Sequence, residues 1–315
     1  MARPSSDLAC RCVYLAGPTA SGKSALALAL AERLGGEIIS ADSMQVYRGL
    51  DIGTAKPSAA DHARVRHHLV DVCAVPEAFD AAQFVRLAEA AATDILARGH
   101  IPIFCGGTGL YLKAFVAGLG EAPASDAALR AELEAQPLAA LLTELAARDP
   151  DCFAVIDRQN PRRVVRALEV IRLTGKPFSA QRADWPAERS AAMTARYFCL
   201  HRDPADLHAR INARVDEMFQ RGLVAETQAL LAHGLAENRI AMQAIGYRQV
   251  VEHLRWERSL AATVELVKVR TRQFAKRQLT WFRAHSQPTW ISLAPAEPLE
   301  RALGVVLERL QRAGS

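Results

Sequence analysis

The chain has 315 residues, half of them apolar, which is enough for one or two globular domains with a sizeable core. No run approaches the roughly 20 uninterrupted apolar residues of a membrane span, and the first residues resemble neither a secretory signal nor a transit peptide, so we expect a soluble, cytoplasmic protein. The six cysteines form no C-x-x-C pair, which argues against a zinc site and a disulfide framework.

The net charge of +5 is unevenly distributed along the chain. Residues 1–120 and 121–200 each carry 11 basic and 11 acidic side chains, whereas residues 201–315 carry 17 basic and 12 acidic ones. This C-terminal excess indicates contact with a polyanion, although the same excess can simply aid solubility.

Strand-like and helix-like segments alternate along most of the chain, which is typical of an α/β fold with helices on both faces of a parallel sheet. Residues 121–196 contain no convincing strand, and their composition favours helix. We therefore predict a P-loop NTPase-like parallel sheet core from residues 1–120 and 197–315, with a helical insertion domain at 121–196. The predicted strands are short apolar runs at 13–16, 37–40, 101–105, 197–201 and 289–293.

A phosphate-loop pattern, G-x-x-x-x-G-K-[ST], lies between the first predicted strand and a predicted helix at 23–34. Its glycines allow backbone N–H groups to surround phosphate oxygens, and the helix N-terminus adds positive potential. We expect Lys23 to supply a charge and the Ser24 hydroxyl to ligate Mg²⁺. A plain Gly-rich turn is the alternative, and the flanking strand and helix argue against it. The loop is Gly17-Pro18-Thr19-Ala20-Ser21-Gly22-Lys23-Ser24.

The strand predicted at 101–105 lacks a feature of ordinary nucleoside triphosphatases, in which an aspartate at a strand end holds Mg²⁺. It runs instead into Gly106-Gly107-Thr108. The missing carboxylate argues against hydrolysis of a γ-phosphate and leaves room for a diphosphate that departs as a unit.

Asp42 follows the second predicted strand, at the sheet edge where open parallel sheets bind their ligands. We expect its carboxylate to face the phosphate loop, to orient an acceptor and to take its proton as a general base. A helix-cap or turn role is the alternative, which position alone does not exclude.

Further motifs follow in order along nearly the whole chain. The motifs are DSMQVYRGLDIGTAKP at 42–57, GGTGLY at 106–111, NPRR at 160–163, RALE at 166–169, Arg210-Ile211, Arg214, Gly222-Leu223, IGYR at 245–248, TRQFAKRQ at 271–278 and Thr280-Trp281. Separately each is weakly specific, but together with the phosphate loop they are highly specific, and the chain resembles the tRNA dimethylallyltransferase family.

The resemblance implies transfer of a dimethylallyl group from dimethylallyl diphosphate to N6 of adenine 37 in the anticodon loop of tRNA, with Mg²⁺ and without ATP hydrolysis. It implies that the phosphate loop binds the diphosphate, that Ser24 lies nearest the metal and that Asp42 accepts the proton of the adenine amine. Thr108 matches a substrate contact and Arg214 a residue that reaches the departing diphosphate, whose developing charge Lys23 and the loop amides would also stabilise. The implied tRNA contacts are Asp42, Ser43, Met44, Gln45, Thr108, Arg130, Arg162, Arg163, Val164, Val165, Arg166, Gln243, Ala244, Ile245, Gly246, Tyr247 and Arg248.

A basic segment at 268–283 contains no acidic residue. On a helix, Lys268, Arg272 and Lys276 share one side, and Phe274 and Trp281 occupy the other. The alternative to RNA binding is a solvated cationic face on a helix whose other side packs in the core. A second arginine cluster, at 158–166, favours RNA, and a deep channel between core and insertion would admit an unstacked adenine. We therefore expect tRNA contacts from Arg272, Lys276 and Arg277.

Several tempting residues are predicted to be structural. His67 and His68 are adjacent, and adjacent side chains rarely bind one metal ion together. Tyr111, Trp256 and Trp281 are expected in the core rather than as base-stacking platforms. Because no cysteine follows Cys199, the zinc finger of some eukaryotic relatives is absent, which implies a bacterial-type, free-standing enzyme, expected to be a monomer.

Three other functions compete with this one. An isopentenyltransferase that uses free adenine nucleotides would share the phosphate loop without needing RNA. A phosphate-loop kinase would transfer a γ-phosphate, and an RNA-binding nucleotide switch would bind RNA without consuming dimethylallyl diphosphate. The basic clusters argue against the first and the missing strand-end carboxylate against the second.

Overall fold

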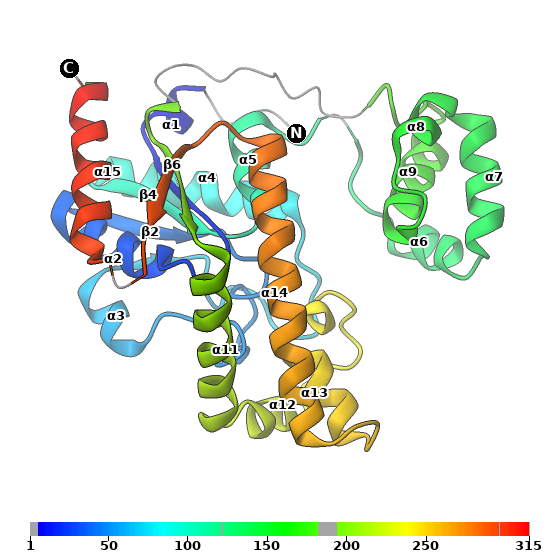
Figure 1. Cartoon of the computed structure of the whole chain (residues 1–315). Coiled ribbons are helices and arrows are strands. Elements are labelled where there is room, and N and C mark those ends of the chain that lie inside the picture. The colour runs from blue at the N-terminus through cyan, green and yellow to red at the C-terminus, as the bar shows by residue number, and fades with distance from the viewer. Residues whose placement is uncertain (1–5, 121, 182–193, 296, 315) are drawn as a thin grey trace. The chain divides into compact units, whose positions relative to one another are not determined.

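The computed structural model describes residues 6–120, 122–181, 194–295 and 297–314, which divide into two compact units. The larger unit is built on a six-stranded parallel sheet in the order β3-β2-β4-β1-β5-β6 (Figure 1). The predicted α/β, P-loop NTPase-like fold is confirmed. The strands are β1 (Val13–Ala16), β2 (Gly36–Ser40), β3 (His67–His68), β4 (Ile101–Gly106), β5 (Tyr197–Arg202) and β6 (Thr289–Leu293).

All five predicted strands are present, with ends that differ by at most one residue. The sixth strand, β3, has only two residues and pairs with β2 at the edge of the sheet. A strand that short gives no periodic pattern in the sequence, so it was missed. The Nε2 of His68 donates a hydrogen bond to the Glu37 carboxylate on β2 at 2.6 Å, which confirms a structural place for this residue.

Alternate residues of β1 face opposite sides of the sheet, as strand geometry requires. Val13 and Leu15 lie in a buried cluster with residues of the helices α2 (Lys23–Leu34) and α15 (Leu299–Gly314). Tyr14 faces the other side, where its ring stacks between Phe104 of β4 and Tyr197 of β5 at centroid distances of 5.2 and 5.5 Å. The central strand is therefore buried on both faces.

Some helices of the larger unit begin with a polar capping residue. The side chain of Ser259 accepts a hydrogen bond from the N–H of Ala262 at the start of α14 (Leu260–His285). Asp80 and Gln83 cap the start of α4 (Ala81–Ala97), each side chain accepting from the backbone N–H of the other. No helix of the described residues is long and apolar enough to cross a membrane. The helices are α1 (Ser6–Cys10), α2 (Lys23–Leu34), α3 (Ala59–Arg64), α4 (Ala81–Ala97), α5 (Gly109–Ala117), α11 (Pro204–Gln220), α12 (Leu223–Leu231), the 3-10 helix η1 (Ala241–Gln243), α13 (Tyr247–Leu254), α14 (Leu260–His285) and α15 (Leu299–Gly314).

The smaller unit consists of helices that fall inside the predicted 121–196 interval, and its described residues contain no strand. It has its own apolar core, which includes Leu133, Leu145 and Leu168. The side chain of Glu169 is fully buried. Its carboxylate accepts hydrogen bonds from Arg130 at 2.7 Å and from Arg166 at 2.6 Å. The helices are α6 (Ala127–Glu134), α7 (Leu138–Arg148), α8 (Pro150–Val155) and α9 (Pro161–Thr174).

The basic segment lies on α14, which confirms its predicted helical conformation. The prediction of which side chains lie on which side of this helix was partly wrong. Lys268 and Arg272 lean on the neighbouring α11, where they contact Asp216 at 2.8 Å and Asn212 at 2.6 Å. Phe274, predicted on the side opposite these basic residues, is 37% exposed. Long basic side chains can lie along a neighbouring helix while their charged ends reach polar partners. The spacing of residues along the helix therefore did not by itself identify the side that packs against α11.

The predicted core aromatics behave differently from one another. Tyr111 is buried and stacks on Phe84 with a centroid distance of 4.2 Å, which confirms the prediction. Trp281 is half-buried, and its ring occupies the space beside Gly109. Trp256 is 92% exposed, in the turn between α13 and α14, so its prediction was wrong. Its backbone has a positive φ of 63° just after the end of α13.

Gly106→Ala should destabilise the protein, because a Cβ at Gly106 would lie 2.1 Å from the carbonyl oxygen of Ala41. Backbone must shift to relieve this overlap, and overpacking of this kind costs about 1–3 kcal/mol. We expect urea denaturation to show a lower free energy of unfolding. Gly304→Ala on α15 meets nothing within 4 Å and is the control, expected to be neutral or slightly stabilising. Equal stability of the two variants would contradict this account of the contact.

Candidate functional site

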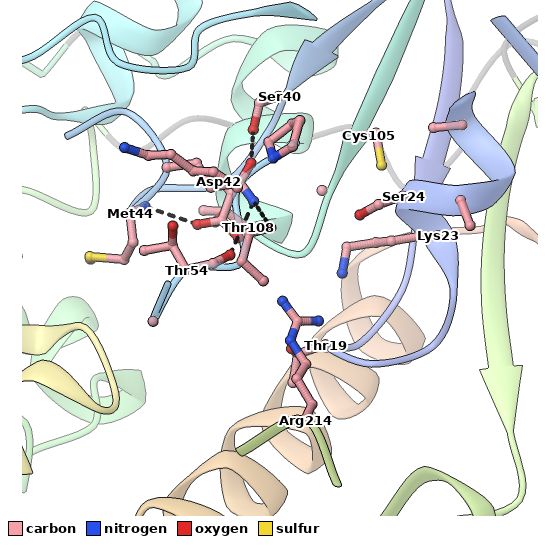
Figure 2. Close-up of a pocket in the computed structure, with 18 of the residues that line it drawn as sticks. Thr19, Lys23, Ser24, Ser40, Asp42, Met44, Thr54, Cys105, Thr108 and Arg214 are labelled. Atoms are coloured by element: carbon pink, nitrogen blue, oxygen red, sulfur yellow. Dashed lines mark hydrogen bonds between the residues drawn. The ribbon is translucent and has the colours of Figure 1, made fainter. Parts of the chain in front are cut away.

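A pocket of about 820 Å³ lies at the carboxyl ends of the central strands in the larger unit. It brings together the phosphate loop and Asp42, as their positions after β1 and β2 predict. Figure 2 shows Lys23 and Asp42 on opposite sides of this pocket, with Arg214 of α11 pointing into the space between them. The predicted site residues that line it are Thr19, Lys23, Ser24, Asp42, Ser43, Met44, Gln45, Thr108, Arg214, Gln243, Ala244, Ile245 and Arg277.

The phosphate loop has the backbone that its glycines permit. Gly17 and Gly22 have φ values of 148° and 100°, which L side chains rarely adopt. A Cβ at Gly17 would also come within 3.1 Å of the carbonyl oxygen of Leu200 on β5. Because α2 begins at Lys23, its first N–H groups have no helical partner and lie at the loop.

Two N–H groups of the loop are already engaged within the protein. Thr19 donates to the side-chain oxygen of Gln278 at 2.9 Å, and Ser21 donates to the carbonyl of Pro18 at 3.3 Å. The predicted cradle for an anion is therefore narrower than the whole loop. It centres on the start of α2, beside the side chains of Lys23 and Ser24.

Two half-buried cations meet in the pocket. Burial lowers the pKa of Lys23 below its usual value, and the nearby charge of Arg214 lowers it further. Burial also lowers the pKa of Arg214, while the Asp42 carboxylate acts in the opposite direction. Within the described residues Arg214 makes no hydrogen bond or ion pair within bonding distance. A multiply charged anion would relieve the repulsion between the two cations, as expected for a diphosphate site.

The Asp42 carboxylate is held in place by its own loop. One of its oxygens accepts a hydrogen bond from the N–H of Met44 at 2.9 Å, and the described residues supply no partner for the other oxygen. Thr108 fixes the same loop, because its hydroxyl accepts from the N–H of Ser43 at 3.1 Å and its N–H donates to Ala41 at 3.1 Å. One carboxylate oxygen thus remains available to a hydrogen-bond donor in the pocket.

The 51–57 segment lines the pocket next to Asp42 and is pinned from α12 and α13. The Glu226 carboxylate accepts from the N–H of Ile52 at 3.0 Å and from the Tyr247 hydroxyl at 2.6 Å. That hydroxyl also accepts from the N–H of Gly53 at 3.0 Å. Gln45 adds hydrogen bonds from its amide to two carbonyls of the same segment, at 3.2 and 3.3 Å. Gln45 thus supports the wall of the pocket.

Gln278 of α14 is a residue whose role sequence reasoning missed. Its side-chain oxygen accepts from Thr19, and its NH₂ group donates to the carbonyl of Gly107 at 3.0 Å. It is 7% exposed. The only signal in the sequence was its place in the 271–278 motif, which did not indicate that a residue of a basic helix would reach inward to the phosphate loop.

Several predicted tRNA contacts are buried within their own unit. Val164 and Val165 belong to the core of the smaller unit, so their side chains are withdrawn from its surface. Ala244 and Tyr247 are buried in the larger unit. These are corrections of the predicted contacts as far as side chains are concerned. Each motif contains apolar positions because its helix must pack against the rest of its unit. The predicted tRNA contacts whose side chains are exposed are Arg162, Arg163, Gln243, Arg248, Lys276 and Arg277.

The described residues contain no group of three or more His, Cys, Asp or Glu side chains that would hold a metal ion by themselves. The Ser24 hydroxyl and the Asp42 carboxylate are oxygen donors in the lining of the pocket. Such a sparse donor set suits Mg²⁺, which is usually bound through one or two protein oxygens together with substrate phosphates and water.

The pH dependence of diphosphate binding should follow the protonation of Lys23. A bound anion favours the charged lysine and raises its pKa, so binding is strongest below the lowered pKa of the free protein and weakens as the pH rises through it. Lys23→Arg stays charged and should flatten this dependence. Isothermal titration calorimetry with inorganic diphosphate measures both proteins. The titration of the ligand is common to them, so identical pH profiles would contradict the assignment.

Gln278→Leu should weaken binding of inorganic diphosphate. It leaves a buried N–H at Thr19 and a buried carbonyl at Gly107 without partners, each costing about 1–3 kcal/mol. Calorimetry should show a lower affinity than wild type. Gln273→Leu, on the exposed side of the same helix, is the control and should bind like wild type. If both variants bound equally, Gln278 would not support the loop.

Comparisons with known proteins agree with these features. The family model described as IPP transferase matches residues 45–285. A Trichlorobacter lovleyi protein named tRNA dimethylallyltransferase 1 is 47% identical over 90% of this chain and 93% of its own length. The structure of a Bacillus halodurans tRNA isopentenylpyrophosphate transferase is 37% identical, with a TM-score of 0.70 over 96% of this chain and 98% of that one. The structure of a eukaryotic dimethylallyltransferase acting on tRNA is 26% identical, with a TM-score of 0.78 over 96% of this chain and 79% of that one.

Proposed function

Because this chain belongs to the IPP transferase family, we propose that it transfers a dimethylallyl group from dimethylallyl diphosphate to N6 of adenine 37 in the anticodon loop of tRNA. The observation that carries this proposal is the pocket in which two half-buried cations face a carboxylate that has one oxygen without a partner among the described residues. The cationic end suits a leaving diphosphate, and the carboxylate suits the amine that attacks.

The reaction requires one bond to form and one to break. The adenine N6 bonds to the first carbon of the dimethylallyl group, and the carbon–oxygen bond to the diphosphate breaks, so that the diphosphate leaves with the electron pair. Lys23, Arg214 and the first N–H groups of α2 stabilise the negative charge that develops on it. Asp42 hydrogen-bonds the amine and takes its proton.

Ser24 would hold Mg²⁺ through its hydroxyl. It lies at the start of α2 and is exposed to the pocket. When bound there with the substrate phosphates, the ion supplies additional positive charge to the leaving group. The side chain of Cys105 lies beside Ser24, but burial raises the pKa of its thiol to about 11, so it stays neutral and is a poor metal ligand at physiological pH.

Basic residues on both units support tRNA as the acceptor. Lys276 and Arg277 are exposed on α14, and Arg277 lines the same pocket as Asp42. In the smaller unit, Arg162 and Arg163 are exposed at the start of α9. We propose that residues 121–196 form a domain that binds tRNA and that the enzyme acts in the cytoplasm as a monomer. Exposed arginines of this kind bind phosphate groups with little dependence on base sequence.

A transfer assay tests the proposal against its rivals. The protein is incubated with labelled dimethylallyl diphosphate, undermodified tRNA and AMP, and the label should appear on the anticodon-loop adenine. Label on AMP would favour the enzyme that uses free nucleotides. Absence of transfer to either acceptor would rule out prenylation, and γ-phosphate transfer from ATP would identify a kinase. RNA and nucleotide binding without turnover would identify a switch.

Two variants separate the proposed roles. Lys23→Ala should lower kcat by about 10²–10³-fold, the usual effect of removing one preorganised donor to a developing anion. Asp42→Asn keeps an oxygen that accepts from Met44 but loses the charge needed to accept a proton, and should lower kcat by about 10²–10⁴-fold. Filter binding should show that both variants retain most of their tRNA affinity. Wild-type kcat in Asp42→Asn would exclude Asp42 as the base.

A further inference from the structure

Phe274 occupies an unexpected place on α14. The spacing of Val267, Thr271, Phe274 and Gln278 puts them on one side of the helix, and all four line the pocket that contains Asp42. Gln278 reaches the phosphate loop at one end of this stripe, and Val267 is buried at the other. Phe274 lies between them, about one helical turn or 6 Å along the axis from Gln278.

The phenyl ring of Phe274 is not needed for packing. It is 37% exposed and is absent from the apolar cluster that Val267 and Ala275 form with α11. The helix fills its deeper positions with Ala275 and Phe282, which are almost fully buried. An aromatic ring left exposed on the wall of a substrate pocket is available to a flat ligand.

The neighbouring Arg277 indicates whether this flat ligand is the dimethylallyl group or a base of the RNA. Its guanidinium carbon lies 5.8 Å from the centre of the Phe274 ring. Among the described residues no carboxylate pairs with Arg277. A fixed positive charge beside the ring would repel the allyl fragment, which becomes cationic during transfer. It would attract the phosphate backbone of RNA, whose bases carry flat aromatic faces.

We propose that Phe274 stacks on an unpaired base of the anticodon loop, next to the adenine that is modified, while Arg277 contacts the adjoining phosphate. This inference rests on the proposed function. Unpaired RNA bases are commonly bound by stacking on aromatic side chains and arginine planes. Phe274 is thereby a tRNA-binding residue, distinct from the residues that bind the diphosphate.

Replacement of the ring tests the proposal. The probe is an anticodon stem-loop RNA with 2-aminopurine beside the acceptor adenine, whose fluorescence reports stacking. Phe274→Leu should bind it about 5- to 150-fold more weakly than wild type and should lose the fluorescence quenching. Phe274→Tyr should restore both. The KM for dimethylallyl diphosphate and the kcat at saturating tRNA should match those of wild type in each variant.

Trp290→Leu is the matched control. Trp290 on β6 is 38% exposed and has the guanidinium carbon of Arg283 6.0 Å from its ring, but it does not line the pocket. This variant should bind the RNA like wild type. Thermal denaturation establishes that all variants are folded.

Two outcomes would overturn the inference. Unchanged affinity and quenching in Phe274→Leu would show that the ring does not meet the RNA, and a raised KM for dimethylallyl diphosphate alone would place it at the allyl group. If wild type itself fails to prenylate tRNA, the proposed function fails instead, so the two failures are distinguishable.

Discussion

The structure of the site depends on two cations held close together in a poorly solvated pocket. Lys23 comes from the start of α2 and Arg214 from the middle of α11, and burial lowers the pKa of both. Their mutual repulsion is tolerable because Asp42 lies within electrostatic reach of each. The diphosphate of the proposed substrate would replace that partial compensation with a stronger one, and its developing charge in the transition state would be met by groups that need not reorganise.

The glycine-rich turn after β4 takes the place that a metal-binding carboxylate has in nucleoside triphosphatases. Three glycines permit close approaches here, one by the loop that carries Asp42 and two by α14. A Cβ at Gly106 would overlap the backbone of Ala41, one at Gly107 would overlap the amide of Gln278, and one at Gly109 would overlap the ring of Trp281. The turn therefore brings the Asp42 loop and the basic helix α14 to the same point, which a carboxylate side chain would prevent.

The sequence predicted the parts of the molecule that local pattern determines. The strands, the phosphate loop and the place of Asp42 follow from short motifs and from the rule that parallel sheets bind ligands at one edge. The facing of α14 did not follow, because Asp216 and Asn212 on α11 draw Lys268 and Arg272 toward that helix. Tertiary partners of this kind are invisible to helical periodicity.

In the proposed function, the single helix α14 would join recognition of RNA to the chemistry of the site. Its exposed side presents Lys276 and Arg277, and its buried side carries Gln278. Because Gln278 bonds both to Thr19 in the phosphate loop and to Gly107 in the turn that holds Asp42 through Thr108, a shift of the helix would disturb both halves of the site. The helix proposed to meet the RNA would therefore also set the distance between the phosphate loop and Asp42, which gives a reason for a buried amide in a basic helix.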